Sequence, residues 1–143
     1  MIELIRHLDW SSRLLRYITT ATSKTFKWGE FDCALNAADS TLAITGVDLV
    51  PQFRGQYSNE EEAFELLRQH GYKNTFEFAL DNYPTKEGIL NGFSGDLGAF
   101  DYNGETIVGL IYQSRIFSPS PGTRGMGSVN LGKAHTVFKV GEA

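Results

Sequence analysis

The apolar residues of this chain change from a helical to a strand-like spacing along the sequence, and this change limits the fold more than any other feature. In the first part of the chain they recur at helical intervals. Beyond Gly92, the alternating segments 95–102 and 105–113 flank Asn103-Gly104, a dipeptide typical of a two-residue hairpin turn. Helices first and strands second predict an α+β fold, in which N-terminal helices pack on a small antiparallel sheet.

Helices are expected before the strands. The first begins after Asp9, a possible N-cap, and its apolar stripe extends to Ala21. The second begins at Cys33, with Asp32 as its N-cap, and Gly46 ends it in the left-handed conformation. This second helix is rich in alanine, so we expect it to be central and packed on several sides.

Two further helices and the remaining strands are indicated by the residues at their ends. Ser58 and Glu61 form a capping box that opens a third helix, and Gly71 closes it. A shorter helix, 75–82, is expected to end ahead of the next proline. The later segments are an extension of the sheet at 115–118, a long Gly/Pro/Ser-rich loop at 118–132 and a final strand at 135–140.

Residues 1–143 are expected to form one domain. This length is usual for a single hydrophobic core, and no internal repeat or linker divides the sequence. The helices have apolar faces that only the later strands can cover. We therefore predict that the two parts fold together.

Composition and charge exclude several classes of partner. The formal net charge is −4, and the 13 Lys and Arg residues are scattered, so nucleic acid is not expected as a partner. No apolar run approaches the roughly 20 residues that cross a bilayer, and residues 1–10 lack the apolar core of a signal peptide. We expect synthesis in a cytoplasm, with neither a membrane-spanning segment nor a signal peptide.

Cys33 is the only cysteine, so it forms no intrachain disulfide and serves either packing or chemistry. At a helix start, unpaired N–H groups and the helix dipole stabilise a thiolate. A nucleophile also needs a base within about 3 Å, usually histidine. His135, which opens the last strand, is the geometric candidate, whereas His7 and His70 have sufficient structural explanations. The spacing of these histidines is not typical of metal ligands, so no metal or organic cofactor is expected.

Trp28, Asp32 and Asp96 are candidates for groove or support positions. Trp28 could line a groove or lie over the core. Asp32 is expected to cap the second helix, and Asp96 to turn the chain into the first long strand by accepting hydrogen bonds from nearby backbone amides. The loop 118–132 could cover Cys33 or become ordered against another protein.

Five ordered segments carry a resemblance to a known family. They are WGEFDCALNAAD, TGVDLV, RGQY, GDL and VFKVG, which extend from about Trp28 to Gly141. In this order they resemble the NlpC-type branch of the papain-like peptidoglycan hydrolases, and more closely the small phage tail proteins of that superfamily. The resemblance implies a papain-like NlpC-type fold, with Cys33 at the position of the nucleophile.

The resemblance also implies a histidine base on the strand after the GDL segment and a polar orienting residue on the next strand. Ile107 occupies the position expected to hold that histidine, and Ala34 stands where the hydrolases commonly have serine. Isoleucine cannot accept a proton, and loss of a base typically removes at least about 10²–10⁴-fold of the rate. Either His135 substitutes from another strand, or the fold persists without catalysis.

Two functions follow from the resemblance. In the first, the chain is a tail-tip or baseplate component of a phage virion with a degenerate active site, and its partners are other tail proteins. In the second, it is a cysteine peptidase or amidase that cleaves peptidoglycan during tail penetration, using Cys33 and His135. A thiol acyltransferase or a redox thiol would use the same cysteine, but no residue pattern selects either.

Overall fold

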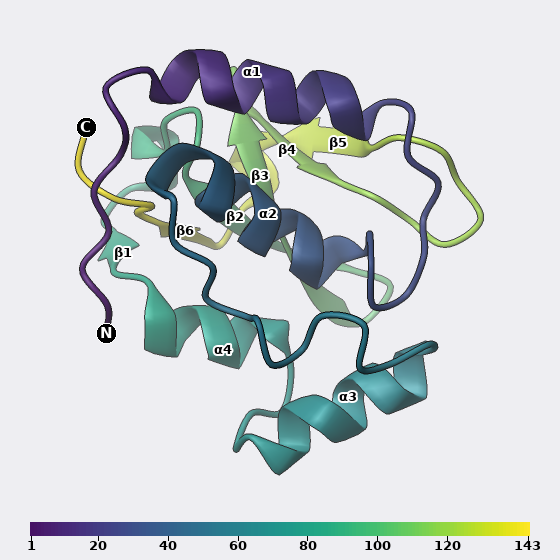
Figure 1. The fold of residues 1–143 in the computed structure, drawn as a ribbon. Helices are drawn as coiled ribbons and strands as arrows, with labels where there is room; N and C mark the ends of the chain where they lie inside the picture. Colours follow the sequence, from purple (N-terminus) through teal and green to yellow (C-terminus); the bar gives the residue numbers. More distant parts are fainter.

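Four helices precede a six-stranded antiparallel sheet in the computed structural model, which describes residues 1–143 (Figure 1). The α+β class predicted from the sequence is therefore confirmed. The helices are α1 (Trp10–Ala21), α2 (Cys33–Thr45), α3 (Glu60–Gln69) and α4 (Thr75–Asn82). The strands are β1 (Thr85–Lys86), β2 (Leu97–Tyr102), β3 (Glu105–Tyr112), β4 (Arg115–Ser118), β5 (Gly127–Asn130) and β6 (Thr136–Phe138). Two short 3-10 helices are η1 (Ile89–Asn91) and η2 (Leu131–Lys133).

Helix α2 has the predicted ends and the predicted central place. The Asp32 carboxylate accepts a hydrogen bond from Leu35 N at 2.9 Å, and Gly46 ends the helix at φ 77°. On the inner side of α2, the Asn36 Oδ1 accepts a hydrogen bond from Tyr17 OH at 2.6 Å, and its Nδ2 donates to Phe117 O at 3.1 Å. This one buried side chain therefore joins α1, α2 and β4.

The starts of α1 and α3 differ from the prediction. Asp9 makes no capping bond, because its carboxylate accepts a hydrogen bond from Arg13 Nε at 2.7 Å instead. The predicted Ser58–Glu61 capping box is wrong by one residue. Asn59 is the N-cap of α3 and accepts from Glu62 N at 2.8 Å, while Glu62 Oε1 accepts from Ser58 N at 2.9 Å. Both side chains bond backbone N–H groups at the helix start, but Glu62 accepts from Ser58, the residue before the N-cap, and extended backbone at Asn59 starts the helix later.

The predicted hairpin connects β2 and β3. Asn103 and Gly104 have φ values of 50° and 80°, and Tyr102 pairs with Glu105. Positive φ at both turn residues is what a type I′ turn requires, which explains why this dipeptide was a reliable signal. The hairpin sets the register of the two longest strands of the sheet.

The expected long loop at 118–132 is not entirely a loop. Its second half contains β5, which pairs with β4, and η2. Its first half is held against the segment before α2, where Phe26 N donates to Thr123 O at 3.1 Å and Gly125 N donates to Lys24 O at 2.8 Å. The strand was missed because GSVN carries only one large apolar residue, so its pairing depends on β4 rather than on its own pattern.

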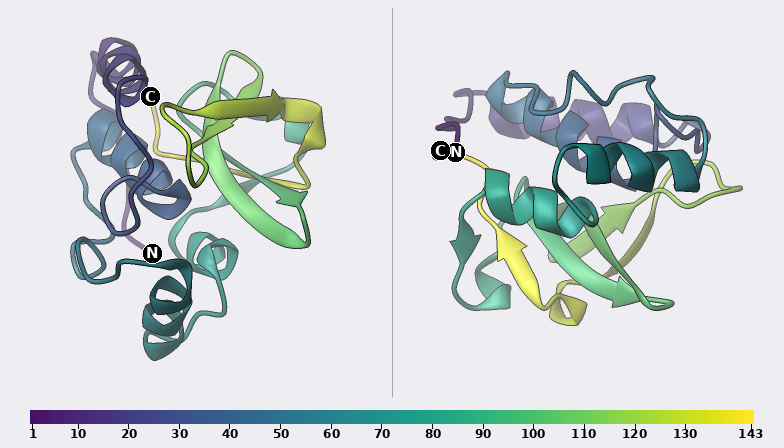
Figure 2. Two further views of the ribbon diagram at one scale, coloured as in Figure 1. Left: turned by 90° about the vertical axis from the view of Figure 1, so that its right-hand side faces the viewer. Right: turned by 90° about the horizontal axis from the view of Figure 1, so that it is seen from below.

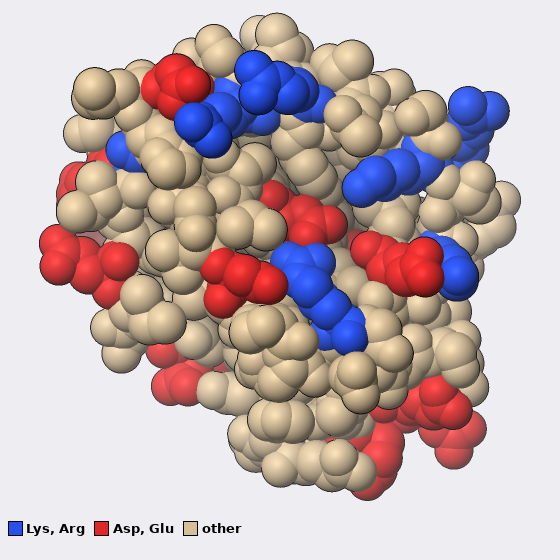
Figure 3. Space-filling view, viewed as in Figure 1, with Lys and Arg blue, Asp and Glu red and all other residues tan.

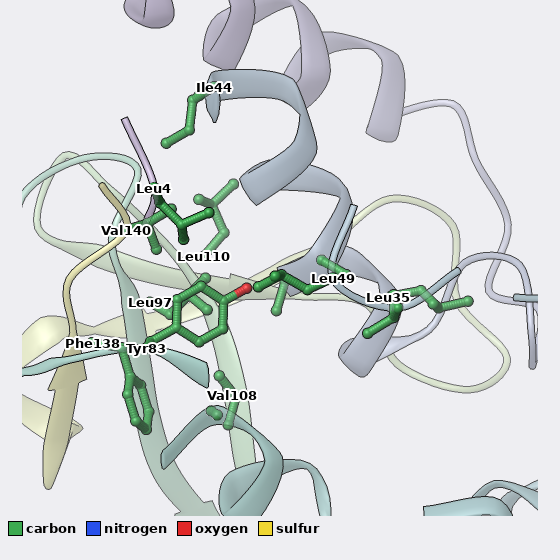
Figure 4. Packing of buried hydrophobic residues seen from close by; sticks show 14 of the residues in the cluster. Leu4, Leu35, Ile44, Leu49, Tyr83, Leu97, Val108, Leu110, Phe138 and Val140 are labelled. Carbon is green, nitrogen blue, oxygen red and sulfur yellow. The ribbon is translucent and has the colours of Figure 1, made fainter. Parts of the chain in front are cut away.

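The sheet has the order β1-β6-β2-β3-β4-β5, with the helices gathered on one of its sides (Figures 1 and 2). The main core lies between the helices and the sheet (Figure 4). A smaller cluster occupies the other face and includes Phe100, Ile111, Ile116, Leu131 and Val137. None of the helices combines the length and the apolarity needed to cross a membrane.

Candidate functional site

Cys33 is the first residue of α2, and hydrogen bonds to its neighbour Asp32 fix its place. Asp32 is only 1% exposed. Its Oδ1 accepts from Leu35 N at 2.9 Å, and its Oδ2 accepts from Gly29 N at 2.9 Å and from Tyr57 OH at 2.6 Å. All three donors are neutral. The candidate nucleophile is therefore held next to a buried carboxylate that no cation contacts.

The approach of Tyr57 to this helix start depends on a glycine. Gly29 has φ +81°, and a Cβ atom there would lie 2.3 Å from the carbonyl oxygen of Tyr57. No sequence pattern pairs Tyr57 with Asp32, because the two residues are 25 positions apart. Tyr57 is thus a member of the site that sequence reasoning did not find, and its place in the RGQY segment was the only signal.

Cys33 is half-buried, and its surroundings favour the protonated thiol. Burial raises the pKa of Cys33 most, and the negative charge of Asp32 raises it further. Hydrogen bonding from the backbone N–H groups at the helix start lowers the pKa by less, so the result is about 12. The stabilisation expected of a helix N-terminus is present but is outweighed by desolvation and by a like charge.

Cys33 lies in the wall of a cavity of about 350 Å³, bounded by α2, α3, α4 and the first residues of β3. Hydrophobic residues make up 19 of its 27 lining residues, so the cavity is mainly apolar. Trp28 lines it and stacks edge-on against Phe26, with ring centroids 4.9 Å apart. Trp28 also packs partly against the main core, so this side chain both lines the cavity and lies over the core.

No histidine lines this cavity. Ile107, at the position expected for the base, lines the cavity, pairs with Phe100 and also packs against the smaller cluster on the other face of the sheet. Its neighbour Val108 belongs to the main core together with Leu35 of α2. The alternation of β3 turns the Val108 side chain into the main core, and at position 107 an apolar residue lines the cavity where a histidine was expected.

His135 does not line the cavity, and it lies just before β6 rather than opening that strand as predicted. Its Nε2 is 3.2 Å from Asp101 Oδ1, and its Nδ1 is 2.9 Å from Thr136 Oγ1. The same Asp101 oxygen accepts a hydrogen bond from Thr106 Oγ1 at 2.7 Å, and Thr106 lines the cavity. The His135 ring is exposed and contacts Phe76 edge-on at 5.4 Å. Thr106 and Asp101 thus connect the cavity wall to His135.

Asp96 lies at the other end of β2 and is not brought to Cys33. It is 1% exposed and accepts hydrogen bonds from Arg6 Nη2 at 3.1 Å and from Lys86 Nζ at 2.7 Å. It also accepts from the backbone N of Phe93 at 2.9 Å and of Val140 at 3.0 Å. The expected bonding to a nearby amide is present, but Arg6 and Lys86 were not foreseen, because long-range partners have no local pattern.

The two remaining histidines, His70 and His7, do not line the cavity, and their contacts are with other parts of the fold. His70 follows α3, where its Nδ1 is 2.9 Å from Leu66 O and its ring packs edge-on against Phe53 at 4.7 Å. His7 lies close to Gly46 at the end of α2. No group of three or more His, Cys, Asp or Glu side chains is arranged to hold a metal ion.

Fold and site together define an α+β protein with a helix-start cysteine beside an apolar cavity. Residues 5–140 match the family model described as "Domain of unknown function (DUF6950)", so the chain belongs to this family. No curated protein and no solved structure matches the chain.

Proposed function

We propose that this chain is a non-catalytic component of a phage tail, at the tail tip or baseplate, built on an NlpC-type papain-like fold. The observation that carries this proposal is that the cavity beside Cys33 contains no histidine. The ordered resemblance from Trp28 to Gly141 supports the phage-tail setting. The order of helices before an antiparallel sheet, with the cysteine at the start of the central helix, is compatible with an NlpC-type fold.

The chemistry of the site supports a structural use of the fold. A cysteine nucleophile attacks as the thiolate and needs a base within hydrogen-bond reach. Burial and the Asp32 charge raise the pKa of Cys33 to about 12, so the thiol is protonated at neutral pH. In this proposal Cys33 is a packing residue of the cavity wall, and the partners of the chain are other tail proteins in the virion.

One observation favours the enzymatic alternative, a peptidoglycan peptidase or amidase that uses Cys33 and His135. His135 is held by the Asp101 carboxylate, which is how a catalytic histidine is commonly oriented. No hydrogen bond joins the His135 ring to the Cys33 thiol, and His135 does not line the cavity, so this function would require the ring to move toward the thiol. A Cys33 pKa of about 12 opposes that function even then.

Infectivity separates the two functions. We expect phage particles with Cys33→Ala or His135→Ala to form normal tails and to infect as well as the parent, and purified protein to release no fragments from peptidoglycan. Deletion of the gene should leave tails defective in electron micrographs. Normal tails after deletion would contradict a structural role. Normal tails with a large loss of infectivity in Cys33→Ala would establish the enzymatic alternative instead.

A further inference from the structure

The cavity beside Cys33 is bounded on one side by a helix whose apolar face is only partly covered. Ala63, Phe64, Leu66 and Leu67 of α3 line the cavity, and α3 has no fully buried residue. Helix α3 lies at the edge of the molecule, farther from the sheet than α2 (Figures 1 and 2). Its apolar face is therefore turned toward open space within the cavity as well as toward the core.

The other walls of the cavity contain small side chains that leave this space unfilled. Ala37 and Ala38 of α2 and Ala79 of α4 line it. The volume of about 350 Å³ falls within the range of binding pockets, roughly 300–1,000 Å³. Protein interiors are otherwise close-packed, and apolar atoms that face a void lack dispersion contacts. Apolar groups supplied from outside would therefore gain contacts here that the chain itself does not make.

The charged side chains around the cavity favour a cationic ligand. Glu60, Lys73 and Glu105 line the cavity and are exposed, and none of them belongs to an ion pair within the chain. Further acidic side chains, Glu61 and Glu62, share the first turn of α3. Red atoms gather over the start of α3 at the lower right of Figure 3. Two exposed, unpaired carboxylates against one ammonium group, with the buried Asp32 carboxylate also in the cavity wall, leave an excess of negative charge for a complementary partner.

We propose that this cavity docks a segment of a partner protein in which one or two bulky apolar side chains, such as Phe or Leu, lie next to Lys or Arg. The apolar side chains enter between α2 and α3, and the cation pairs with Glu60 or Glu105. Only the identity of the partner as another tail protein rests on the proposed function. The recognition chemistry is independent of it.

Blocked tetrapeptides test this recognition on the full chain. The probes are Gly-Phe-Lys-Gly, Gly-Phe-Gln-Gly and Gly-Phe-Glu-Gly, titrated into isotope-labelled protein and followed by amide chemical shifts. We expect the Lys peptide to shift the amides of α3 and of Cys33. The Lys peptide should bind about twofold to fivefold more tightly than the Glu peptide at low salt, and the difference should shrink at high salt.

Matched variants separate the apolar from the ionic part of the recognition. Ala63→Phe fills the cavity and should abolish binding, whereas Gln69→Phe adds the same ring to an exposed position of α3 outside the cavity and should leave binding unchanged. The double variant Glu60→Gln with Glu105→Gln should remove most of the preference for the Lys peptide. Glu87→Gln, an exposed carboxylate elsewhere that forms no ion pair, is its control.

The opposite outcomes would overturn the inference. The inference is wrong if none of the three peptides shifts any amide at millimolar concentration. It is also wrong if the Lys and Glu peptides bind equally. Binding of benzene or toluene without binding of any peptide would make the cavity a small-molecule pocket instead. Because infectivity of the Cys33→Ala phage is measured separately, failure of the docking inference and failure of the proposed tail role are distinguishable.

Discussion

Two aspartates of this protein are equally buried but have opposite surroundings. Asp32 and Asp96 are each 1% exposed. Asp96 accepts hydrogen bonds from two cations, Arg6 and Lys86, besides two backbone amides. Asp32 accepts only from neutral groups, which are two backbone amides and the Tyr57 hydroxyl. One buried charge is therefore neutralised by ion pairs, and the other is not.

Because their surroundings differ, the two aspartates stabilise different parts of the structure. Asp96 joins the N-terminal segment at Arg6, β1 at Lys86 and the chain after β6 at Val140, so it connects both ends of the chain to the sheet. Asp32 orders the start of α2, and its uncompensated charge helps to keep the neighbouring Cys33 protonated. A cysteine at a helix start is therefore not activated by that position alone when a like charge is buried beside it.

The largest expected loss of folding stability follows substitution of Asp96, the ion-paired aspartate. Asp96→Asn removes the charge that the buried Arg6 and the half-buried Lys86 share, and removing one partner of a buried ion pair typically costs about 3–5 kcal/mol. Asp32→Asn keeps a side chain that caps helices well and leaves no unpaired cation, so we expect a loss of about 1–3 kcal/mol. Urea unfolding followed by circular dichroism measures both. Equal losses in the two variants would show that the cations around Asp96 contribute little.

A smaller loss of folding stability is expected at alkaline pH, where the Cys33 thiol ionises. Burial and Asp32 raise the pKa of Cys33 from 9.0 to about 12, so the folded protein holds this proton more tightly than the unfolded chain. Stability from this group is complete below about pH 9 and is lost as the pH rises toward 12. Relative to Cys33→Ala, the wild type should lose about 1 kcal/mol per pH unit within this window.

The Cys33→Ala variant is the control for the alkaline titration, because the buried tyrosines ionise in both proteins and cancel in the difference. The free energy of unfolding should be measured between pH 8 and about pH 10.5. In Asp32→Asn, the rise of the Cys33 alkylation rate should move to lower pH. An alkylation rate that is already maximal at neutral pH would contradict the assignment of a protonated thiol.

The smallest effect is expected at His135. Its hydrogen bonds to Asp101 and Thr136 are exposed, so His135→Ala should leave the thermal unfolding midpoint nearly unchanged. Its removal should also leave the pH dependence of Cys33 alkylation unchanged, because His135 does not line the cavity. A Cys33 pKa that rises in His135→Ala would reveal a Cys–His pair and would restore the enzymatic alternative.

Local sequence signals predicted the elements whose geometry depends on adjacent residues. Asp32 and Gly46 marked the ends of α2, and Asn103-Gly104 marked the hairpin, because caps and tight turns use short-range hydrogen bonds and restricted φ values. Strand β5 was not predicted, because its few side chains have little strand preference and its pairing with β4 is a contact between distant segments. The capping box was misplaced by one residue because Ser58 and Asn59 are both good caps.

Some features of the candidate site were also predicted from the sequence, and others depend on the tertiary structure. The sequence by itself determined that one cysteine begins the central helix behind an aspartate cap, and that isoleucine stands where a histidine was expected. Tertiary structure alone decided that Tyr57 and Asp32 share a hydrogen bond, that His135 is held by Asp101, and that Cys33 faces an apolar cavity. Burial and the charges of distant neighbours set the pKa of a thiol, and these depend on contacts between segments that no local pattern encodes.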